Sequence, residues 1–121
     1  MNKVIETHFT NEELDCKCGC GLSVRDDFLI LLEALRAMVG LPLPISSGAR
    51  CDEYNKKIGG VENSRHIFGV AVDITCTTSE FRSLIIRSAI ALGMYGFGIA
   101  EGFVHIDIRH KDRSRLWLYG A

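Results

Sequence analysis

The chain has 121 residues, enough for one domain, and its 47% hydrophobic and 24% charged residues are ordinary for a globular protein. Fourteen basic and fifteen acidic residues give a formal net charge of −1, which argues against a surface built to attract nucleic acid or an anionic membrane. No segment approaches the roughly 20 apolar residues of a membrane-spanning helix. We therefore expect one domain over residues 1–121, with neither nucleic acid nor membrane as a partner.

Four helices are predicted. Three of them begin at the spacing of a capping box, a hydroxyl residue followed three positions later by an acidic residue: Thr10 with Glu13, Ser23 with Asp26, and Thr77 with Glu80. The second of these is the strongest, because apolar residues recur at helical spacing over residues 25–39 before Gly40 ends it. The third extends to Gly93, and a fourth, shorter helix follows Arg50 as far as Ile58.

Short strands are predicted between and after the helices. Residues 70–75 and 103–108 are rich in β-branched residues, and residues 116–119 would close the set. Residues 97–100 would form a further edge, and residues 43–47, interrupted by Pro44, form an edge strand at best. Helices come first and strands concentrate later, around glycine-rich connections. The pattern predicts a single small α+β domain with a mainly antiparallel sheet and helices packed on one face of it.

The N-terminus and the cysteines bear on where the protein acts. The opening sequence MNKVIETHFTNEEL has no apolar stretch of a secretory signal peptide, which predicts a protein made in the cytoplasm.

Cys16, Cys18 and Cys20 form C-x-C-x-C, whereas Cys51 and Cys76 stand alone. In a cytoplasmic product we expect free thiols or metal ligands before disulfides, although the spacing differs from the C-x2-C of structural zinc sites. A second zinc and a disulfide among the first four cysteines both stay open, and Cys76 is expected to be a small buried residue.

Two histidines and two aspartates lie in or next to otherwise apolar strands. Asp73 is flanked on both sides by apolar residues, where burial of an unpaired carboxylate would be unfavourable. His66 precedes that strand at a glycine turn. His105 and Asp107 point the same way on a later strand, because side chains alternate with period two. Asp73 therefore needs a cation or a strong hydrogen-bond donor beside it.

One metal ion would satisfy this set. Two imidazoles and one carboxylate, from His66, Asp73 and His105, match the three protein ligands of a catalytic zinc, which leaves a fourth position for water. The alternative is a pair of histidines satisfied by ordinary hydrogen bonds, with Asp73 in a turn or a salt bridge. Four such residues in apolar strands favour the metal.

The sequence resembles the zinc D-Ala-D-Ala carboxypeptidase family (peptidase family M15), in particular its short members encoded by phages and prophages. The resemblance rests on S-G-A-R-C-D-E-Y-N at 47–55, S-R-H-I-F-G-V-A-V-D-I at 64–74 and F-V-H-I-D-I-R at 103–109. The opening H-F-T-N-E-E-L and the C-x-C-G-C-G segment also look like that subgroup. The order H-x6-D followed by H-x-D is specific, although each piece alone is weak.

The resemblance implies roles at individual positions. His66, Asp73 and His105 fall where the family's zinc ligands fall. Arg50 matches an arginine placed near the substrate carbonyl or carboxylate, and a forked guanidinium suits that task, although a salt bridge at a helix start would also explain it. Ser64 matches a serine that can hydrogen-bond substrate, and a plain turn residue is the alternative.

The catalytic base departs from the better-known pattern. Many family members carry an acidic residue three positions before the last ligand, and that position is Gly102 here. Glu101 and Asp107 are the remaining acidic candidates. We expect Glu101 to be the base, because a turn at Gly102 could bring it over the metal, and Asp107 to orient His105. Asp107 is the alternative base.

The resemblance implies a zinc metallopeptidase that hydrolyses peptide bonds of bacterial peptidoglycan, as a carboxypeptidase or an endopeptidase. Its cofactor would be one catalytic Zn²⁺ ion and its partner the peptidoglycan peptide. Delivery to the cell wall would then depend on a holin or a virion. The alternative is a non-catalytic, zinc-containing module that binds cell-wall peptide within a phage or prophage particle. A third possibility is a structural metal domain in which the cysteines also bind zinc.

Overall fold

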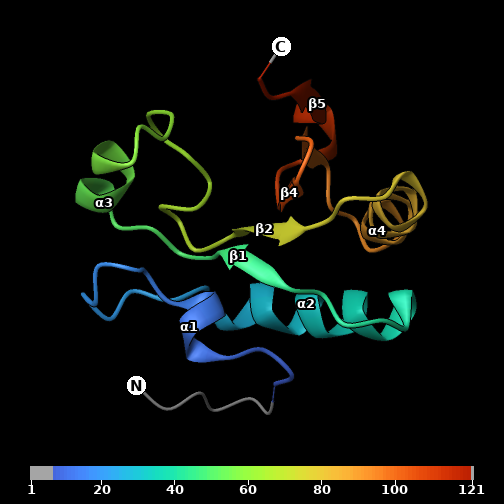
Figure 1. Ribbon diagram of the computed structural model, residues 1–121, viewed down its shortest axis with the longest axis horizontal. Helices are drawn as coiled ribbons and strands as arrows, with labels where there is room; N and C mark the ends of the chain where they lie inside the picture. Colours follow the sequence, from blue (N-terminus) through green and yellow to red (C-terminus); the bar gives the residue numbers. More distant parts are fainter. Residues whose placement is uncertain (1–6, 121) are drawn as a thin grey trace.

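A five-stranded sheet forms the centre of the computed structural model, which describes residues 7–120 (Figure 1). The strands are β1 (Ile45–Ser47), β2 (Ala71–Thr75), β3 (Gly96–Ile99), β4 (Phe103–Asp107) and β5 (Arg115–Leu118). The helices are α1 (Asn11–Leu14), α2 (Asp26–Val39), α3 (Asp52–Lys57) and α4 (Ser79–Ala91), with a 3-10 turn at Lys111–Arg113. Part of the stretch used to predict the absence of a signal peptide, residues 1–6, lies outside the described residues.

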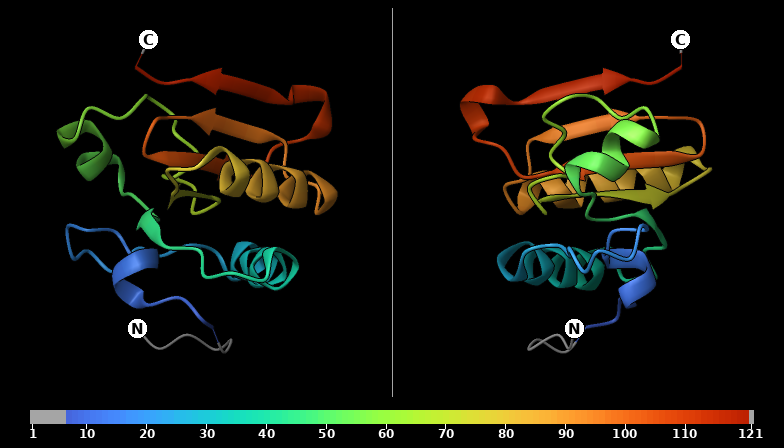
Figure 2. Two further views of the ribbon diagram at one scale, coloured as in Figure 1. Left: turned by 45° about the vertical axis from the view of Figure 1, so that its right-hand side comes forward. Right: turned by 90° about the vertical axis from the view of Figure 1, so that its left-hand side faces the viewer.

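The strand order is β1-β2-β4-β3-β5, and every pairing is antiparallel except that of β3 with β5, which is parallel. The predicted α+β class with a mainly antiparallel sheet is therefore confirmed. Figure 2 shows β5, in red, at the edge of the sheet farthest from α2. Within residues 7–120, no helix combines the length and apolar composition needed to cross a membrane.

The two faces of the sheet have different roles. Helix α4 covers one face and packs against α2, whereas α3 and the loop after it lie over the opposite face (Figures 1 and 2). The prediction that all helices pack on one face is therefore wrong for α3. Along β2, Val72 and Ile74 point into the hydrophobic core and Asp73 points away from it, because side chains alternate. The same alternation along β4 leaves the polar residues of both strands on the α3 side.

Only one of the three predicted capping boxes forms. In α1, the Thr10 hydroxyl accepts from the Glu13 backbone and the Glu13 carboxylate accepts from the Thr10 backbone. The N-cap of α2 is Arg25, not Ser23, because the Arg25 amide donates to the Gly69 carbonyl 2.9 Å away and this residue stays extended. The prediction of a box with Asp26 is therefore wrong.

At α4 the prediction fails by a shift of one residue. Thr78, rather than Thr77, is the N-cap, and its hydroxyl accepts from the Phe81 amide. Glu80 therefore lies one position too early to complete a box. Two adjacent threonines offer the same capping group, so the sequence alone does not decide between them.

Glu33 of α2 holds the N-terminal segment in place. Its carboxylate accepts from the Thr7 hydroxyl and the His8 backbone, both at 2.7 Å, and lies 2.6 Å from His8 Nδ1. Burial raises the pKa of Glu33, but these hydrogen bonds outweigh burial and lower it. A lowered native pKa stabilises the protein above the unfolded-state pKa of about 4.3, and this stabilisation is lost as the pH falls toward the native value.

We expect Glu33→Gln to lower the free energy of unfolding at pH 7 by about 1–2 kcal/mol, because a charged acceptor of three hydrogen bonds is lost. The difference from wild type should begin to shrink as the pH falls below about 4.3, where the carboxylate of the unfolded chain protonates, and should be lost as the pH falls through the lowered native pKa. Urea unfolding at several pH values measures both effects, with Glu53→Gln on exposed α3 as the control. A difference that persists unchanged at acidic pH, after Glu33 is protonated, would contradict this explanation.

Candidate metal centre

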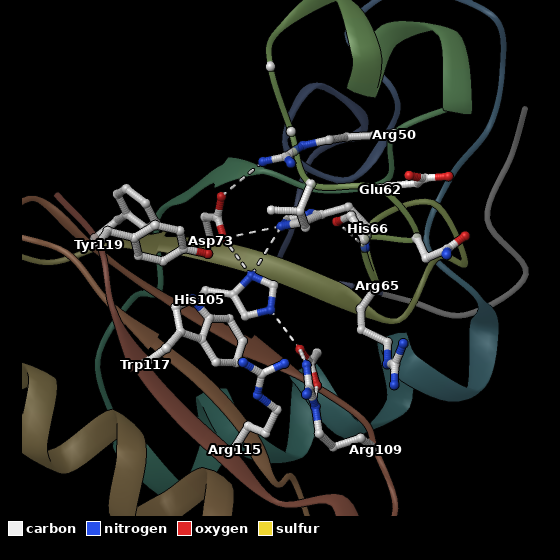
Figure 3. A pocket seen from close by; sticks show the side chains of 17 residues that line it. Arg50, Glu62, Arg65, His66, Asp73, His105, Arg109, Arg115, Trp117 and Tyr119 are labelled. Atoms are coloured by element: carbon white, nitrogen blue, oxygen red, sulfur yellow. Dashed lines mark hydrogen bonds and ion pairs between the residues drawn. The ribbon is translucent and has the colours of Figure 1, made fainter.

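Three side chains converge on the α3 side of the sheet. His66 lies in the loop before β2, Asp73 in β2, and His105 opposite Asp73 in β4. His66 Nε2 is 3.2 Å from both Asp73 Oδ1 and His105 Nδ1, and His105 Nδ1 is 3.0 Å from Asp73 Oδ1. All three residues are buried. Figure 3 shows these contacts as dashed lines at the centre of the cleft.

The outer nitrogens of both imidazoles already have partners. His66 Nδ1 donates to the Gly48 carbonyl at 2.6 Å, and His105 Nε2 donates to Asp107 Oδ2 at 2.7 Å. Each neutral ring has one proton, so the two inner nitrogens present lone pairs toward each other and toward the Asp73 carboxylate. Three acceptors that face one point favour a cation between them.

This donor set fits zinc. Three ligands of a tetrahedral zinc at about 2.0–2.1 Å lie about 3.3 Å apart, and the ligand atoms here lie 3.0–3.2 Å apart. The hydrogen bonds to the Gly48 carbonyl and the Asp107 carboxylate are the outer partners that metal-bound imidazoles usually have. His66, Asp73 and His105 would hold the ion.

The carboxylates of the site are held in their charged form. Burial raises the pKa of Asp73, but its hydrogen bonds with His105 and His66 outweigh burial and hold this pKa well below its usual range. Burial likewise raises the pKa of Asp107, and hydrogen bonds with Arg109 and His105 outweigh it and lower this pKa. Both groups are therefore ionised at neutral pH, which favours binding of a cation.

Arg50 and Asp107 flank this triad. Arg50 lies 3.2 Å from Asp73 Oδ2 and also donates to Ser47 and Asn55, so it fixes the side of Asp73 that faces away from the histidines. Asp107 is fully buried and accepts from His105 on one side and from Arg109 on the other. This is the orienting position expected for Asp107. It lies on the far side of the imidazole from the inner nitrogen, which does not favour Asp107 as the base.

Ser64 and Glu101 are placed differently. Ser64 is buried at the edge of the cleft, and its hydroxyl oxygen accepts from the His66 amide at 3.2 Å. Glu101 is exposed in the bend before β4 and is not among the residues that line the cleft. Its backbone carbonyl accepts from Arg82. The strand begins only at Phe103, so alternation does not carry Glu101 onto the His105 side, and its position does not favour the role predicted for it.

The triad lies in a cleft of about 720 Å³. Loop residues 59–65 form one wall, and Arg115, Trp117 and Tyr119 form the other (Figure 3). The sequence predicted the strand that carries this second wall but did not indicate its function. The signal was present in the alternation of Arg115, Trp117 and Tyr119 with two leucines, which places the three on one face.

Aromatic and cationic side chains stack along this wall. The Trp117 ring lies 5.1 Å from the His105 ring, and the guanidinium carbons of Arg109 and Arg115 lie 5.2 and 5.8 Å from the Trp117 centroid. Tyr119 continues the wall, with its ring 6.1 Å from that of Trp117. The indole therefore separates the triad from the outer arginine and shields His105 from water on that side.

Two glycines of β3 make room for these groups. Gly96 lies opposite Asp107 in the register, and a Cβ at Gly96 would overlap the Asp107 carboxylate and lie 2.5 Å from Arg109 Nε. A Cβ at Gly98 would lie 2.6 Å from the indole nitrogen of Trp117. Because these two positions lack side chains, the buried ion pair and the aromatic wall can lie directly on the backbone of β3.

Alanine at Gly96 is therefore expected to lower the free energy of unfolding by about 1–3 kcal/mol, because the Asp107–Arg109 pair must move. It should also weaken zinc binding by about 10–100-fold, since Asp107 orients a ligand. Thermal unfolding and competition with a chelator measure the two effects. Gly102→Ala is the matched control, because nothing lies within 4 Å of its added Cβ. Equal effects of the two substitutions would contradict the close packing at Gly96.

Comparison with known proteins agrees with this geometry. A family model described as Peptidase M15 matches residues 7–107, which include all three residues of the triad and end with β4. No curated protein matches the chain. The matched region covers most of the 121 residues and contains a buried set of two imidazoles and one carboxylate arranged for zinc. The chain therefore belongs to the peptidase M15 family, whose members are zinc enzymes.

Proposed function

We propose that this protein is a zinc metallopeptidase that hydrolyses peptide bonds of bacterial peptidoglycan, as a carboxypeptidase or an endopeptidase. The observation that carries the proposal is the convergence of two imidazole lone pairs and a carboxylate oxygen within 3.0–3.2 Å at the base of an open cleft. A site made only to stabilise the fold would use all four zinc positions and lie away from solvent. Three ligands beside a cleft leave a position for substrate.

The charge of the cleft supports a substrate that carries carboxylates. The cleft is lined by four arginines, Arg50, Arg65, Arg109 and Arg115, and by three carboxylates, Glu62, Asp73 and Asp107. Arg50 pairs with Asp73 and Arg109 with Asp107, which leaves Arg65 and Arg115 against Glu62. A bound dication would add further positive charge. Stem peptides of the cell wall carry free carboxylates, so the cleft and this substrate are complementary in charge.

Peptide hydrolysis requires that water add to the carbonyl carbon, that the C–N bond break, and that a proton reach the leaving nitrogen. A zinc ion held by the triad would supply Lewis acidity and lower the pKa of a water molecule. Arg50, fixed by three acceptors, presents its guanidinium beside Asp73 and would stabilise the negative charge that develops on the carbonyl oxygen. Partial desolvation raises the pKa of Tyr119, so its hydroxyl stays protonated, and from the wall of the cleft it would donate a second hydrogen bond to that oxygen.

Glu62 takes the role of proton shuttle in this proposal. It is the exposed carboxylate among the residues that line the cleft (Figure 3). A general base must reach the attacking water directly or through one other water. Asp73 and Asp107 are occupied by other partners, and Glu101 lies outside the cleft. Glu62 would accept the proton of the water and pass it to the leaving nitrogen.

A non-catalytic module that binds cell-wall peptide, within a phage or prophage particle, is the second candidate. The observation that favours it is Gly102, which stands three positions before His105, together with the exposed position of Glu101. The same cleft and arginines would then bind peptide without cleaving it. In either case action on the cell wall would require delivery by a holin or a virion.

Mass analysis of products separates these candidates. The purified protein with zinc is incubated with intact peptidoglycan and with soluble muropeptides that end in D-Ala-D-Ala. Release of D-alanine indicates a carboxypeptidase, and loss of cross-linked dimers indicates an endopeptidase. Binding to peptidoglycan without any new fragment, at a confirmed zinc content, would support the binding module and overturn the peptidase.

A further inference from the structure

Four cysteines that the metal triad does not use lie together where the loop after α1 meets the start of α3. The sulfur atoms of Cys16, Cys18, Cys20 and Cys51 all lie within 4.8 Å of one another. Cys16 Sγ is 3.4 Å from Cys18 Sγ, and Cys18 Sγ is 3.7 Å from Cys51 Sγ. Cys16 is buried and Cys51 half-buried, whereas the other two are exposed.

The backbone is folded to bring these sulfurs to one point. Gly19 and Gly21 have φ of 82° and 91°, a left-handed conformation that lets the loop between Cys16 and Leu22 double back. The Cys16 amide donates to the Leu22 carbonyl at 2.8 Å and closes that loop. Cys51 comes from a distant part of the sequence, as the N-cap residue of α3.

Backbone amides also point at two of the sulfurs. The Cys51 amide lies 3.4 Å from Cys16 Sγ, and the Tyr54 amide lies 3.3 Å from Cys51 Sγ. Donors aimed at sulfur stabilise thiolates, the form of cysteine that binds metal. A neutral thiol is a weak hydrogen-bond acceptor, so these two amides would stabilise it less than they stabilise a thiolate.

We propose that Cys16, Cys18, Cys20 and Cys51 form a tetrathiolate site that binds one structural Zn²⁺ ion. Four thiolates around a tetrahedral zinc at about 2.3 Å lie about 3.8 Å apart, close to the sulfur separations of 3.4 and 3.7 Å. A closed set of four sulfurs leaves no position for substrate, so the ion would stabilise the fold. This inference is independent of the proposed peptidase activity.

The site would fix the segment that supports the triad. Cys51 directly follows Arg50, which contacts Asp73, and Gly48 supplies the carbonyl that orients His66. A Cβ at Gly48 would lie 2.5 Å from the Leu14 carbonyl oxygen, so this segment passes tightly against the end of α1. The tetrathiolate site would anchor that segment from its other end.

Metal content tests the proposal. The full chain is purified under reducing conditions without chelator, dialysed against metal-free buffer, and measured for zinc per chain by mass spectrometry of the elements. We expect two zinc ions in wild type and one in Cys18→Ser and in Cys20→Ser, whose exposed side chains contribute little packing to the fold. Cys76→Ser is the control, because Cys76 is not part of the cluster, and it should keep two.

Cobalt spectroscopy of the wild type and of two variants gives a second readout. Cobalt in a tetrathiolate site produces intense thiolate-to-metal charge-transfer bands, and these should be present in Asp73→Ala and much weaker in Cys18→Ser. Absence of these bands in wild type, or a single zinc that is lost in Asp73→Ala and kept in Cys18→Ser, would overturn the site. Iron instead of zinc would overturn the metal assigned.

Thiol titration excludes the covalent alternative. Denatured, chelator-treated protein without reductant should show all five cysteines as thiols. Fewer thiols, with a pair of the cluster cysteines joined, would indicate a disulfide that is incompatible with four thiolate ligands and would overturn the proposal.

Discussion

Asp73→Ala is expected to remove one tightly bound zinc ion per chain and all peptidase activity. Asp73 is the one anionic ligand of the triad, and its second oxygen is bound by Arg50. Without it, two imidazoles and the half-buried Arg50 guanidinium surround the site, so the remaining charge repels a dication. Zinc content after dialysis measures the first effect, and release of peptide fragments from peptidoglycan measures the second.

His66→Ala and His105→Ala should have the same two effects, because each removes one of three ligands. His110→Ala is the matched control: His110 is exposed, lies in the turn before β5, and is not part of the triad. It should keep the wild-type zinc content. If Asp73→Ala retained as much zinc as His110→Ala, the triad would not be the metal site.

Glu62→Gln is expected to lower kcat by about 10²–10⁴-fold, the usual contribution of a general base. The substitution keeps the size of the side chain and removes its charge. Because Glu62 is not a ligand, zinc content should stay at the wild-type value, which separates loss of proton transfer from loss of metal. Steady-state kinetics on a soluble muropeptide, with zinc measured on the same sample, checks both.

Glu101→Gln is the direct comparison for Glu62→Gln. Glu101 is exposed and outside the cleft, so its variant should keep a kcat near that of wild type. Loss of turnover in Glu101→Gln with full turnover in Glu62→Gln would return the role of base to Glu101. Inactive wild type with a full complement of zinc would instead favour the peptide-binding module.

The triad could be predicted from the sequence because its polar residues lie within or beside apolar segments. Asp73 interrupts an apolar strand, and His105 with Asp107 interrupts another, so the local pattern alone indicates a buried polar site at each place. The strand register then places Asp73 opposite His105. The position of the base could not be predicted in the same way, since it depends on where a strand begins.

Local sequence patterns did not predict which other residues line the cleft, because tertiary structure determines their positions. Alternation would have placed Glu101 beside His105, but the chain bends at residues 101–102 and β4 starts at Phe103. Glu62 reaches the cleft only because the loop after α3 crosses the open face of the sheet. Trp117 reaches His105 because β5 pairs with β3 at glycine positions, a register that no local pattern specifies.

Strand β5 carries a wall of the cleft but contributes no residue to the triad. This strand is at the edge of the sheet, pairs only with β3 among the described strands, and lies beyond the region that the family model matches. Its Trp117 and the adjoining Tyr119 form a wall of the cleft, yet neither belongs to the hydrophobic core. Under the proposed function, substitutions at these two positions would alter the wall that a bound peptide meets, while the three triad residues and the hydrophobic core stay unchanged.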